Sequence, residues 1–284
     1  MSIHPLSAVS PDARLGVGVT VHPFAVIEAG AEIGDYCTVK SGAVIKTGVK
    51  TGCHNEFGEH AVIGGNPQHV AQPEKIGNVT IGDHNVFREH VTIHRGLKSD
   101  GVTTVGDHNY LMSAAHLGHD VIMGNNCICA NGTLIGGHVT VEDQAFISGA
   151  VAIHQFCRIG RLAMVGGHAR VVQDVPPFML IDGQSGCVVG LNIVGLKRSS
   201  HHGSDAITEL KSAYRTVYRR GLTWKGVLAA LENEFKSGPV DLLRQFLASG
   251  TRGFCQERRS PPATTLRIRM PEKQSDKSVR ARAG

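Results

Sequence analysis

The sequence predicts an all-β coil built from six-residue repeats, followed by a small α-helical domain. Every sixth residue from Ile3 to Val171 is apolar at 25 of 29 positions, and the register never slips. We call these positions anchors. Glycine occupies twelve of the 29 positions that directly follow an anchor. Beyond Val171 the apolar spacing becomes that of helices, so the fold changes near this residue.

A six-residue period fits neither a strand nor a helix, and it indicates a coil with three short sides in each 18-residue turn. Each anchor then stacks on the anchors 18 residues away, with coils spaced like paired strands. Glycine fits the corners, where a positive φ costs little. This pattern resembles the hexapeptide-repeat family, whose fold is the left-handed parallel β-helix.

The repeat and its interruptions divide the chain into three parts. The β-helix is expected over residues 1–183, with external loops at 64–80 and 96–104, where three of the four polar anchors fall. A helical domain is expected over 184–255. Ser204 is expected to cap its first helix, which Gly221 ends, and further helices start near Thr223 and Pro239. Residues 256–284 are expected to form a basic, disordered tail.

Composition narrows the class of protein. The net charge is +5, and residues 257–284 alone carry eight Lys and Arg against three Asp and Glu. The remaining body is balanced, which argues against nucleic acid as a partner. No apolar run reaches the length of a membrane span, and the start lacks an export signal. We therefore expect a cytoplasmic protein whose seven cysteines are reduced.

The cysteines do not predict a thiol nucleophile. Cys37, Cys127 and Cys157 lie four residues after an anchor, at a small inward position, and Cys129 is itself an anchor. A reactive thiol needs exposure and a neighbouring charge that lowers its pKa. Burial is therefore the favoured interpretation.

One patch brings together residues that could do chemistry. With 18 residues per turn, Asp120 faces His138 on the next coil, and His119 stands over Gly137. A carboxylate beside an imidazole orients a general base, and a glycine N–H without a covering side chain can hold an oxyanion. Acyl transfer requires such a general base and such an oxyanion donor. Two alternatives stay open: an outward row of solvated histidines on a non-catalytic scaffold, and a zinc centre like that of γ-class carbonic anhydrases, built from His116, His119, His138 and His154.

Longer segments carry a more specific resemblance, from Ile3 to about Phe254. The chain resembles the family of O-acyltransferases that use acyl carrier protein and UDP-N-acetylglucosamine at the start of lipid A biosynthesis. The segments that carry it are 91–96 (VTIHRG), 115–120 (AHLGHD), 137–138 (GH), 151–156 (VAIHQF), 164–167 (MVGG), 172–177 (VQDVPP) and 191–198 (LNIVGLKR).

The resemblance implies a role for each matching residue. His119 would be the general base for the sugar 3-hydroxyl, Asp120 its support, and Gly137 the oxyanion donor. Gly167, beside Met164, would limit the length of the 3-hydroxyacyl chain. The positions that would bind or shape the substrates are Gln68, His94, His116, His138, His154, Gln155, Asn192 and Arg198.

The family also implies an assembly. It works as a homotrimer with clefts between subunits, and it needs no cofactor or metal. The repeat arithmetic agrees, because Val165, the anchor beside Gly167, lies two sides along from the column of Leu117. One coil therefore cannot easily gather His119 and Gly167.

The chain departs from the family at several positions. His69 replaces the usual aspartate and Ala71 the usual lysine of the sugar-binding loop, so a 3-amino sugar nucleotide is an alternative acceptor. Val194 replaces a nucleotide-contacting glutamate and Ser199 a second arginine. The tail beyond 257 matches no part of the family.

Overall fold

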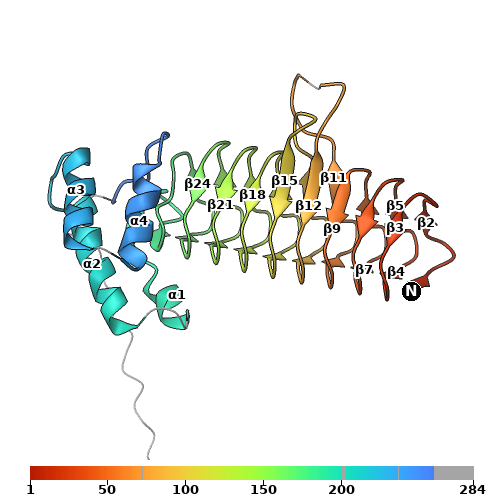
Figure 1. Ribbon diagram of the computed structural model, residues 1–284, viewed down its shortest axis with the longest axis horizontal. Coiled ribbons are helices and arrows are strands. Elements are labelled where there is room, and N and C mark those ends of the chain that lie inside the picture. Colours follow the sequence, from red (N-terminus) through yellow and green to blue (C-terminus); the bar gives the residue numbers. More distant parts are fainter. Residues whose placement is uncertain (72, 200–202, 236, 259–284) are drawn as a thin grey trace, which may run out of the picture.

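The computed structural model describes residues 1–71, 73–199, 203–235 and 237–258. Three sheets form the sides of a prism, and successive strands pass from one sheet to the next (Figure 1). All strand pairs are parallel except the last one of the first sheet. The predicted left-handed parallel β-helix is confirmed. A helical region covers one end of the prism, and two loops project from one edge (Figure 1).

Each side of the prism is a stack of very short strands. The first sheet consists of β1 (Ser2–Ile3), β4 (Thr20–Val21), β7 (Thr38–Val39), β10 (Glu56–Phe57), β13 (Val86–Phe87), β16 (Tyr110–Leu111), β19 (Ile128–Cys129), β22 (Phe146–Ile147), β25 (Met164–Val165), β27 (Met179–Ile181) and β28 (Val188–Leu191). The second sheet consists of β2 (Ala8–Val9), β5 (Val26–Ile27), β8 (Val44–Ile45), β11 (Val62–Gly65), β14 (Thr92–His94), β17 (His116–Leu117), β20 (Leu134–Ile135), β23 (Ala152–Ile153) and β26 (Arg170–Val171). The third sheet consists of β3 (Arg14–Leu15), β6 (Glu32–Ile33), β9 (Val49–Thr51), β12 (Asn78–Ile81), β15 (Val102–Val105), β18 (Ile122–Met123), β21 (Thr140–Val141) and β24 (Arg158–Ile159).

The anchors form the core. In the second sheet, anchors from Ile27 to Ile135 stack on one another and are almost fully buried. Burial of one such side chain contributes about 1.5–3 kcal/mol, so the ladder stabilises the prism along its whole length. The cysteines expected inside, Cys37, Cys127, Cys129 and Cys157, are also buried.

The two loops preserve the six-residue phase. Phe57 pairs with Phe87 and Phe87 with Leu111, which are separations of 30 and 24 residues instead of 18. The first loop therefore adds two repeats and the second adds one. For this reason the anchors keep their register across both insertions. In the structure β11 takes up residues 64 and 65, and β12 and β15 take up the last residues of the expected loops. The irregular segments among the described residues are therefore 66–71, 73–77 and 95–101.

The expectation that glycine serves the corners by its positive φ was wrong for the glycines that follow anchors, except Gly64, whose φ is 87°. The positive φ falls two residues later, mostly on residues with side chains, such as His54 at 57° and His84 at 56°. Gly16 and Gly34 instead lie where a side chain would collide with the next coil. Close approach of the coils, and not backbone freedom, therefore requires glycine after the anchor.

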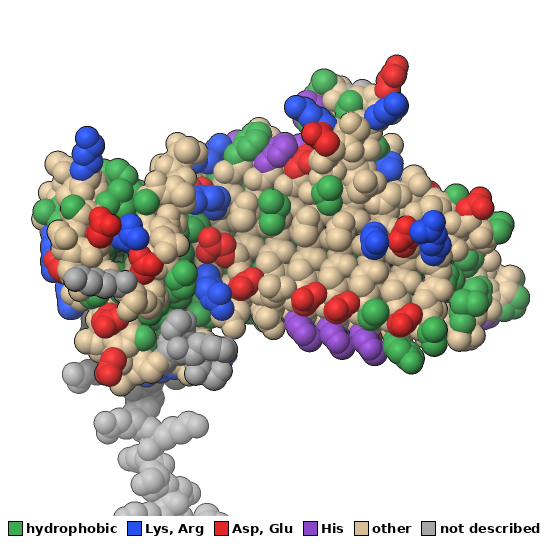
Figure 2. Space-filling view, viewed as in Figure 1, with side chains coloured by type: hydrophobic (Ala, Val, Ile, Leu, Met, Phe, Trp, Pro, Cys, Tyr) green, Lys and Arg blue, Asp and Glu red, His purple; other side chains and the backbone are tan. Residues whose placement is uncertain are grey.

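The exposed corner residues also form ordered columns. The rings of His54, His84 and His108 stack with centroids 4.7 and 4.8 Å apart. Figure 2 shows a row of histidine side chains along one edge of the prism, beside acidic side chains. His54, His84 and His108 are all exposed.

Among the described residues, four helices follow the prism: α1 (Ile193–Arg198), α2 (Ser204–Tyr218), α3 (Trp224–Glu234) and α4 (Pro239–Ala248). The N-cap of α2 is Gly203 rather than Ser204, and that helix ends at Tyr218, before Gly221. The helix α1 and the antiparallel strand β28 have no counterpart in the sequence-based expectation. In the described part of the chain, no helix is long and apolar enough to cross a membrane.

Arg158 fixes the helical region to the end of the prism. Its Nε donates to Oδ2 of the buried Asp174 at 2.8 Å, and its Nη2 donates to the carbonyl of Phe246 in α4 at 2.9 Å. The guanidinium also lies 4.0 Å from the centre of the Phe246 ring. The expected tail lies outside the described residues, apart from 256–258.

Candidate active site

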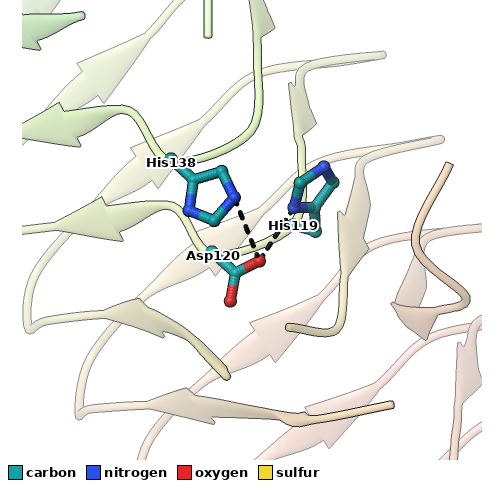
Figure 3. A group of neighbouring side chains, drawn as sticks. All are labelled: His119, Asp120 and His138. Carbon is teal, nitrogen blue, oxygen red and sulfur yellow. Dashed lines mark hydrogen bonds and ion pairs between the residues drawn. The ribbon is translucent and has the colours of Figure 1, made fainter. Parts of the chain in front are cut away.

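The strand β17 ends at Leu117, and the chain then turns a corner toward β18 with His119 and Asp120 in the turn. His138 occupies the same corner one coil further on, and its N–H donates to the carbonyl of His119 at 2.9 Å. Asp120 has a φ of 58°, a left-handed conformation that aspartate tolerates. The three side chains converge on one point (Figure 3).

Asp120 is the centre of this cluster. Its Oδ2 lies 2.8 Å from Nδ1 of His119 and 3.7 Å from Nε2 of His138. A proton on Nδ1 of His119, donated to Asp120, leaves Nε2 as the atom that can accept a proton. The arrangement is therefore that of an imidazole general base oriented by a carboxylate.

Two further residues hold Asp120, one through its carboxylate and one through its backbone. The backbone N–H of Leu97 donates to Oδ2 of Asp120 at 2.9 Å, and Oγ1 of the buried Thr103 accepts from the N–H of Asp120 at 2.8 Å. Leu97 belongs to the second loop, and Thr103 belongs to β15, the strand that follows it. Sequence reasoning missed them, because the inserted loop breaks the simple relation between position and coil.

The cluster is largely withdrawn from water. The exposed fractions of the side chains are 9% for His119, 14% for Asp120 and 37% for His138. Burial lowers the pKa of His138, and the nearby Asp120 carboxylate partly opposes this effect. A shielded site strengthens each polar contact within it.

Gly137 lies against the ring of His119. A Cβ at this position would be 2.7 Å from both Cε1 and Nε2 of His119. Within the described residues, the N–H of Gly137 donates no hydrogen bond, whereas its carbonyl accepts from Phe156 N–H at 3.0 Å. The structure thus places an unused backbone donor beside the imidazole, as the column arithmetic predicted.

A shallow hollow of about 560 Å³ lies over the second sheet. Gln68 and His116 both line it, together with Gly136 and exposed apolar side chains such as Leu134. The hollow is wide enough for a small ligand. Sequence reasoning predicted both Gln68 and His116 as substrate contacts, and the structure brings them to one surface.

His94 and His116 form a second imidazole pair. Their ring centroids are 5.0 Å apart. Nδ1 of His116 lies 2.8 Å from Oγ1 of Thr92, and Nδ1 of His94 contacts the carbonyl of Asn66. Burial lowers the pKa of His116 to about 4 and also lowers that of His94, so both rings are neutral near pH 7. Thr92 and Asn66 were not predicted. Thr92 pairs with His116 across the second loop, and Asn66 belongs to the first.

His154 and Gln155 lie further along the prism. Both are exposed, and Nδ1 of His154 lies 2.8 Å from Nη2 of Arg252 in the helical region. These two residues lie 98 positions apart in the sequence, so no repeat pattern could have predicted their contact. Arg252 therefore adds a cation to this side of the site.

The remaining predicted residues lie elsewhere. Asn192 caps α1 through its Oδ1, and its Nδ2 donates to the carbonyl of Leu162 at 3.0 Å. Arg198 is exposed in the last turn of α1, and Met164 and Gly167 belong to the first sheet and the corner after it. In the described structure no contact joins these four residues to His119 within one chain.

His69, one of the departures from the family, reaches the cluster. Its ring centroid lies 5.9 Å from that of His119, edge to face. Nδ1 of His69 lies 3.1 Å from the backbone N and O of Ala71. An imidazole, not a carboxylate, thus faces the base from the first loop.

The zinc alternative needs three imidazoles around one ion. Among the described residues, the only group of potential ligands gathered closely enough is His119, Asp120 and His138, whose ligand atoms lie within 4.8 Å of one another. His116 and His154 lie outside this group. The alternative centre of three histidines is therefore not assembled among the described residues of one chain.

Comparison with known proteins addresses the family directly. Residues 12–47 match the family described as bacterial transferase hexapeptide (six repeats), and residues 174–255 match Udp N-acetylglucosamine O-acyltransferase, Domain 2. The acyl-[acyl-carrier-protein]–UDP-N-acetylglucosamine O-acyltransferase of Burkholderia orbicola is 45% identical over 258 residues, which cover 89% of this chain and 98% of the relative. This chain belongs to that acyltransferase family.

Other relatives agree. The enzyme of the same name from Pseudomonas fluorescens is 46% identical over 254 residues, which cover 89% of this chain and 98% of the relative. A solved UDP-N-acetylglucosamine acyltransferase from Bacteroides fragilis superimposes with a TM-score of 0.87 at 35% identity and covers 89% of this chain and all of that one. The acyltransferase fold thus includes both the prism and the helical region.

Proposed function

We propose that this acyltransferase moves a 3-hydroxyacyl group from acyl carrier protein to the 3-hydroxyl of UDP-N-acetylglucosamine, the first step of lipid A biosynthesis. Family membership supports the reaction class. The observation that carries the mechanism is the His119–Asp120 pair beside the unused N–H of Gly137. Together they provide a base and an oxyanion donor at one point.

The reaction follows from this geometry. Nε2 of His119 takes the proton of the sugar hydroxyl while its oxygen attacks the thioester carbon. Asp120 stabilises the imidazolium that forms, and the N–H of Gly137 donates to the oxyanion of the tetrahedral intermediate. When the C–S bond breaks, His119 returns its proton to the departing thiolate. The acyl group thus passes directly to the sugar, with no acyl-enzyme.

The thiols support direct transfer. Burial raises the pKa of Cys127 to about 12 and that of Cys129 still further, so neither is a thiolate near pH 7. All seven cysteines are free, as expected for a protein of a reducing compartment. We propose a cytoplasmic location for the enzyme.

The substrates occupy two regions in this proposal. Gln68, His94, His116 and His138 shape the site around the sugar and the thioester. His154 and Gln155 extend it along the prism. Asn192 and Arg198 bind the nucleotide, where the guanidinium suits a diphosphate.

The site is completed by assembly. Gly167 belongs to the corner between the first and second sheets, whereas His119 belongs to the corner between the second and third. One prism cannot easily gather both corners around one acyl chain, so we propose a homotrimer with a cleft between neighbouring subunits. Gly167 and Met164 of one subunit then limit the acyl chain that starts at His119 of another.

The test uses mass spectrometry of the products formed from UDP-N-acetylglucosamine and a series of 3-hydroxyacyl carrier proteins. The proposal predicts a singly acylated, base-labile ester of the sugar nucleotide. A product only with a 3-amino sugar nucleotide would contradict the hydroxyl acceptor. No acylated product with either acceptor would contradict the proposed reaction.

A further inference from the structure

A pocket separate from the hollow lies between the two projecting loops. It has a volume of about 550 Å³ and is lined by Asn66, Pro67, Pro73, Glu74, Lys75, Ile76, Arg95 and Ser99. None of these residues belongs to the proposed catalytic or substrate-binding set. Figure 2 shows charged side chains of both signs gathered on this projection.

The positive charge of Arg95 is incompletely balanced. Its Nη2 donates to Oδ1 of Asn66 at 2.9 Å, whereas its Nε is buried and has no hydrogen-bond partner among the described residues. The carboxylate of Glu28 attracts the charge of Arg95 from a distance, but it already forms an ion pair with Lys46 at 2.8 Å. Burial lowers the pKa of Arg95, as expected for a cation that lost water without gaining a counter-ion.

Lys75 adds a second cation at the pocket wall. It is exposed, and it forms no ion pair with a carboxylate in the described part of the chain. Glu74 contributes one negative charge, so the lining carries a net positive charge. A guanidinium and an ammonium that face one polar cavity match an oxyanion with two negative charges better than a carboxylate with one.

We propose that this pocket binds a phosphate dianion, either inorganic phosphate or a small phosphomonoester, through Arg95 and Lys75. The hydroxyl of Ser99 and the amide of Asn66 supply neutral polar groups at the same wall.

Asn66 connects this pocket to the active site. Its side chain accepts from Arg95, and its carbonyl contacts Nδ1 of His94. It also begins the loop that carries Gln68 and His69. An anion on Arg95 competes with Asn66 for the guanidinium, so occupancy changes how this loop is held. The pocket therefore couples phosphate to the binding of the acceptor sugar.

The direct test is isothermal titration of the full-length protein with inorganic phosphate, glycerol phosphate and acetate, without substrates and at constant ionic strength. We expect saturable 1:1 binding of both phosphates with a Kd of about 1 mM or lower, and weaker binding of acetate. Glycerol phosphate that binds more tightly than inorganic phosphate would identify a phosphomonoester as the ligand, and the reverse order would identify free phosphate.

Three variants locate the site. Arg95→Gln removes the charge but keeps an amide that can donate to Asn66, and it should weaken phosphate binding at least tenfold. Lys75→Met should weaken it about threefold or more. Lys50→Met removes an exposed lysine outside the pocket and should change nothing. Absence of saturable phosphate binding, equal affinity for acetate, or equal binding by Arg95→Gln and Lys50→Met would overturn the proposal.

The coupling has its own readout. Saturating phosphate should change the KM for UDP-N-acetylglucosamine in the wild type and not in Arg95→Gln. This readout depends on the proposed function, whereas the titration does not. Binding without acyl transfer would contradict the enzyme assignment alone, and acyl transfer without binding would contradict the phosphate pocket alone.

Discussion

The ring of His119 occupies the space that a side chain on Gly137 would need. A Cβ at Gly137 would lie 2.7 Å from Nε2 of His119, which is well inside van der Waals contact. Glycine at this position therefore serves two purposes: it admits the base, and it leaves the backbone N–H uncovered. The residue type at position 137 is thus dictated by the His119 side chain of the preceding coil.

Gly137→Ala should consequently displace the imidazole and reduce kcat/KM by at least about 10²-fold, comparable to loss of a general base. Gly226→Ala in α3 is the matched control, because its Cβ would lie 3.3 Å from Oγ1 of Thr223 and far from the chemistry in sequence. Steady-state kinetics on both variants, with circular dichroism to verify the fold, make the comparison. Full activity in Gly137→Ala would contradict this prediction, because the His119 ring would then tolerate a side chain at position 137.

Asp120→Asn tests the carboxylate that orients the base. The amide removes the negative charge that supports the imidazolium, and it leaves only one oxygen to accept from Leu97 N–H and His119 Nδ1–H. We expect kcat to fall between about 10²- and 10⁴-fold. The measurement is kcat with saturating substrates, and Asp100→Asn in the exposed second loop is the control. A fall of less than about threefold would mean that His119 is oriented by other contacts.

Gly167→Met tests the proposed limit on acyl length. A Cβ at Gly167 would lie 3.4 Å from the nearest atom, the carbonyl of Gly149, so the position accepts a side chain without strain in the single chain. The longer side chain should shift the preferred 3-hydroxyacyl group to a shorter one. Competition between carrier proteins loaded with different chains, read by product mass, measures the preference. An unchanged preference would remove Gly167 from the acyl site.

The buried His116 should make the free energy of unfolding depend on pH. Burial lowers its pKa in the folded protein to about 4, whereas its ordinary value is 6.5. Between these values the unfolded chain binds a proton that the folded chain does not, so the contribution of His116 lowers the free energy of unfolding as the pH falls from 6.5 to 4. Relative to wild type, His116→Gln should therefore be more stable at pH 5 than at pH 7.5. Urea unfolding at the two pH values tests this, and a pH-independent difference would contradict it.

The sequence contained most of the fold. The period of six specified the prism, because each anchor must face the same interior, and loops that add whole repeats leave that period intact. The role of Gly34 could not be read in the same way. A side chain at Gly34 would collide with the backbone of the next coil, and a sequence does not give the distance between coils.

The site was predictable only where the repeat was uninterrupted. Asp120, His138 and Gly137 follow from a simple 18-residue turn. Leu97, Thr103 and Asn66 reach the site from inserted loops, and Arg252 reaches it from the helical region. These contacts depend on the path of each insertion, which no periodicity encodes.

The central claim is that Nε2 of His119 is the general base. The most direct measurement is kcat/KM of His119→Gln beside wild type, with product mass as the assay and thermal unfolding as the check on the fold. The account predicts a loss of at least about 10²-fold with an unchanged unfolding temperature. Activity within about threefold of wild type would contradict it and assign the proton transfer to another group.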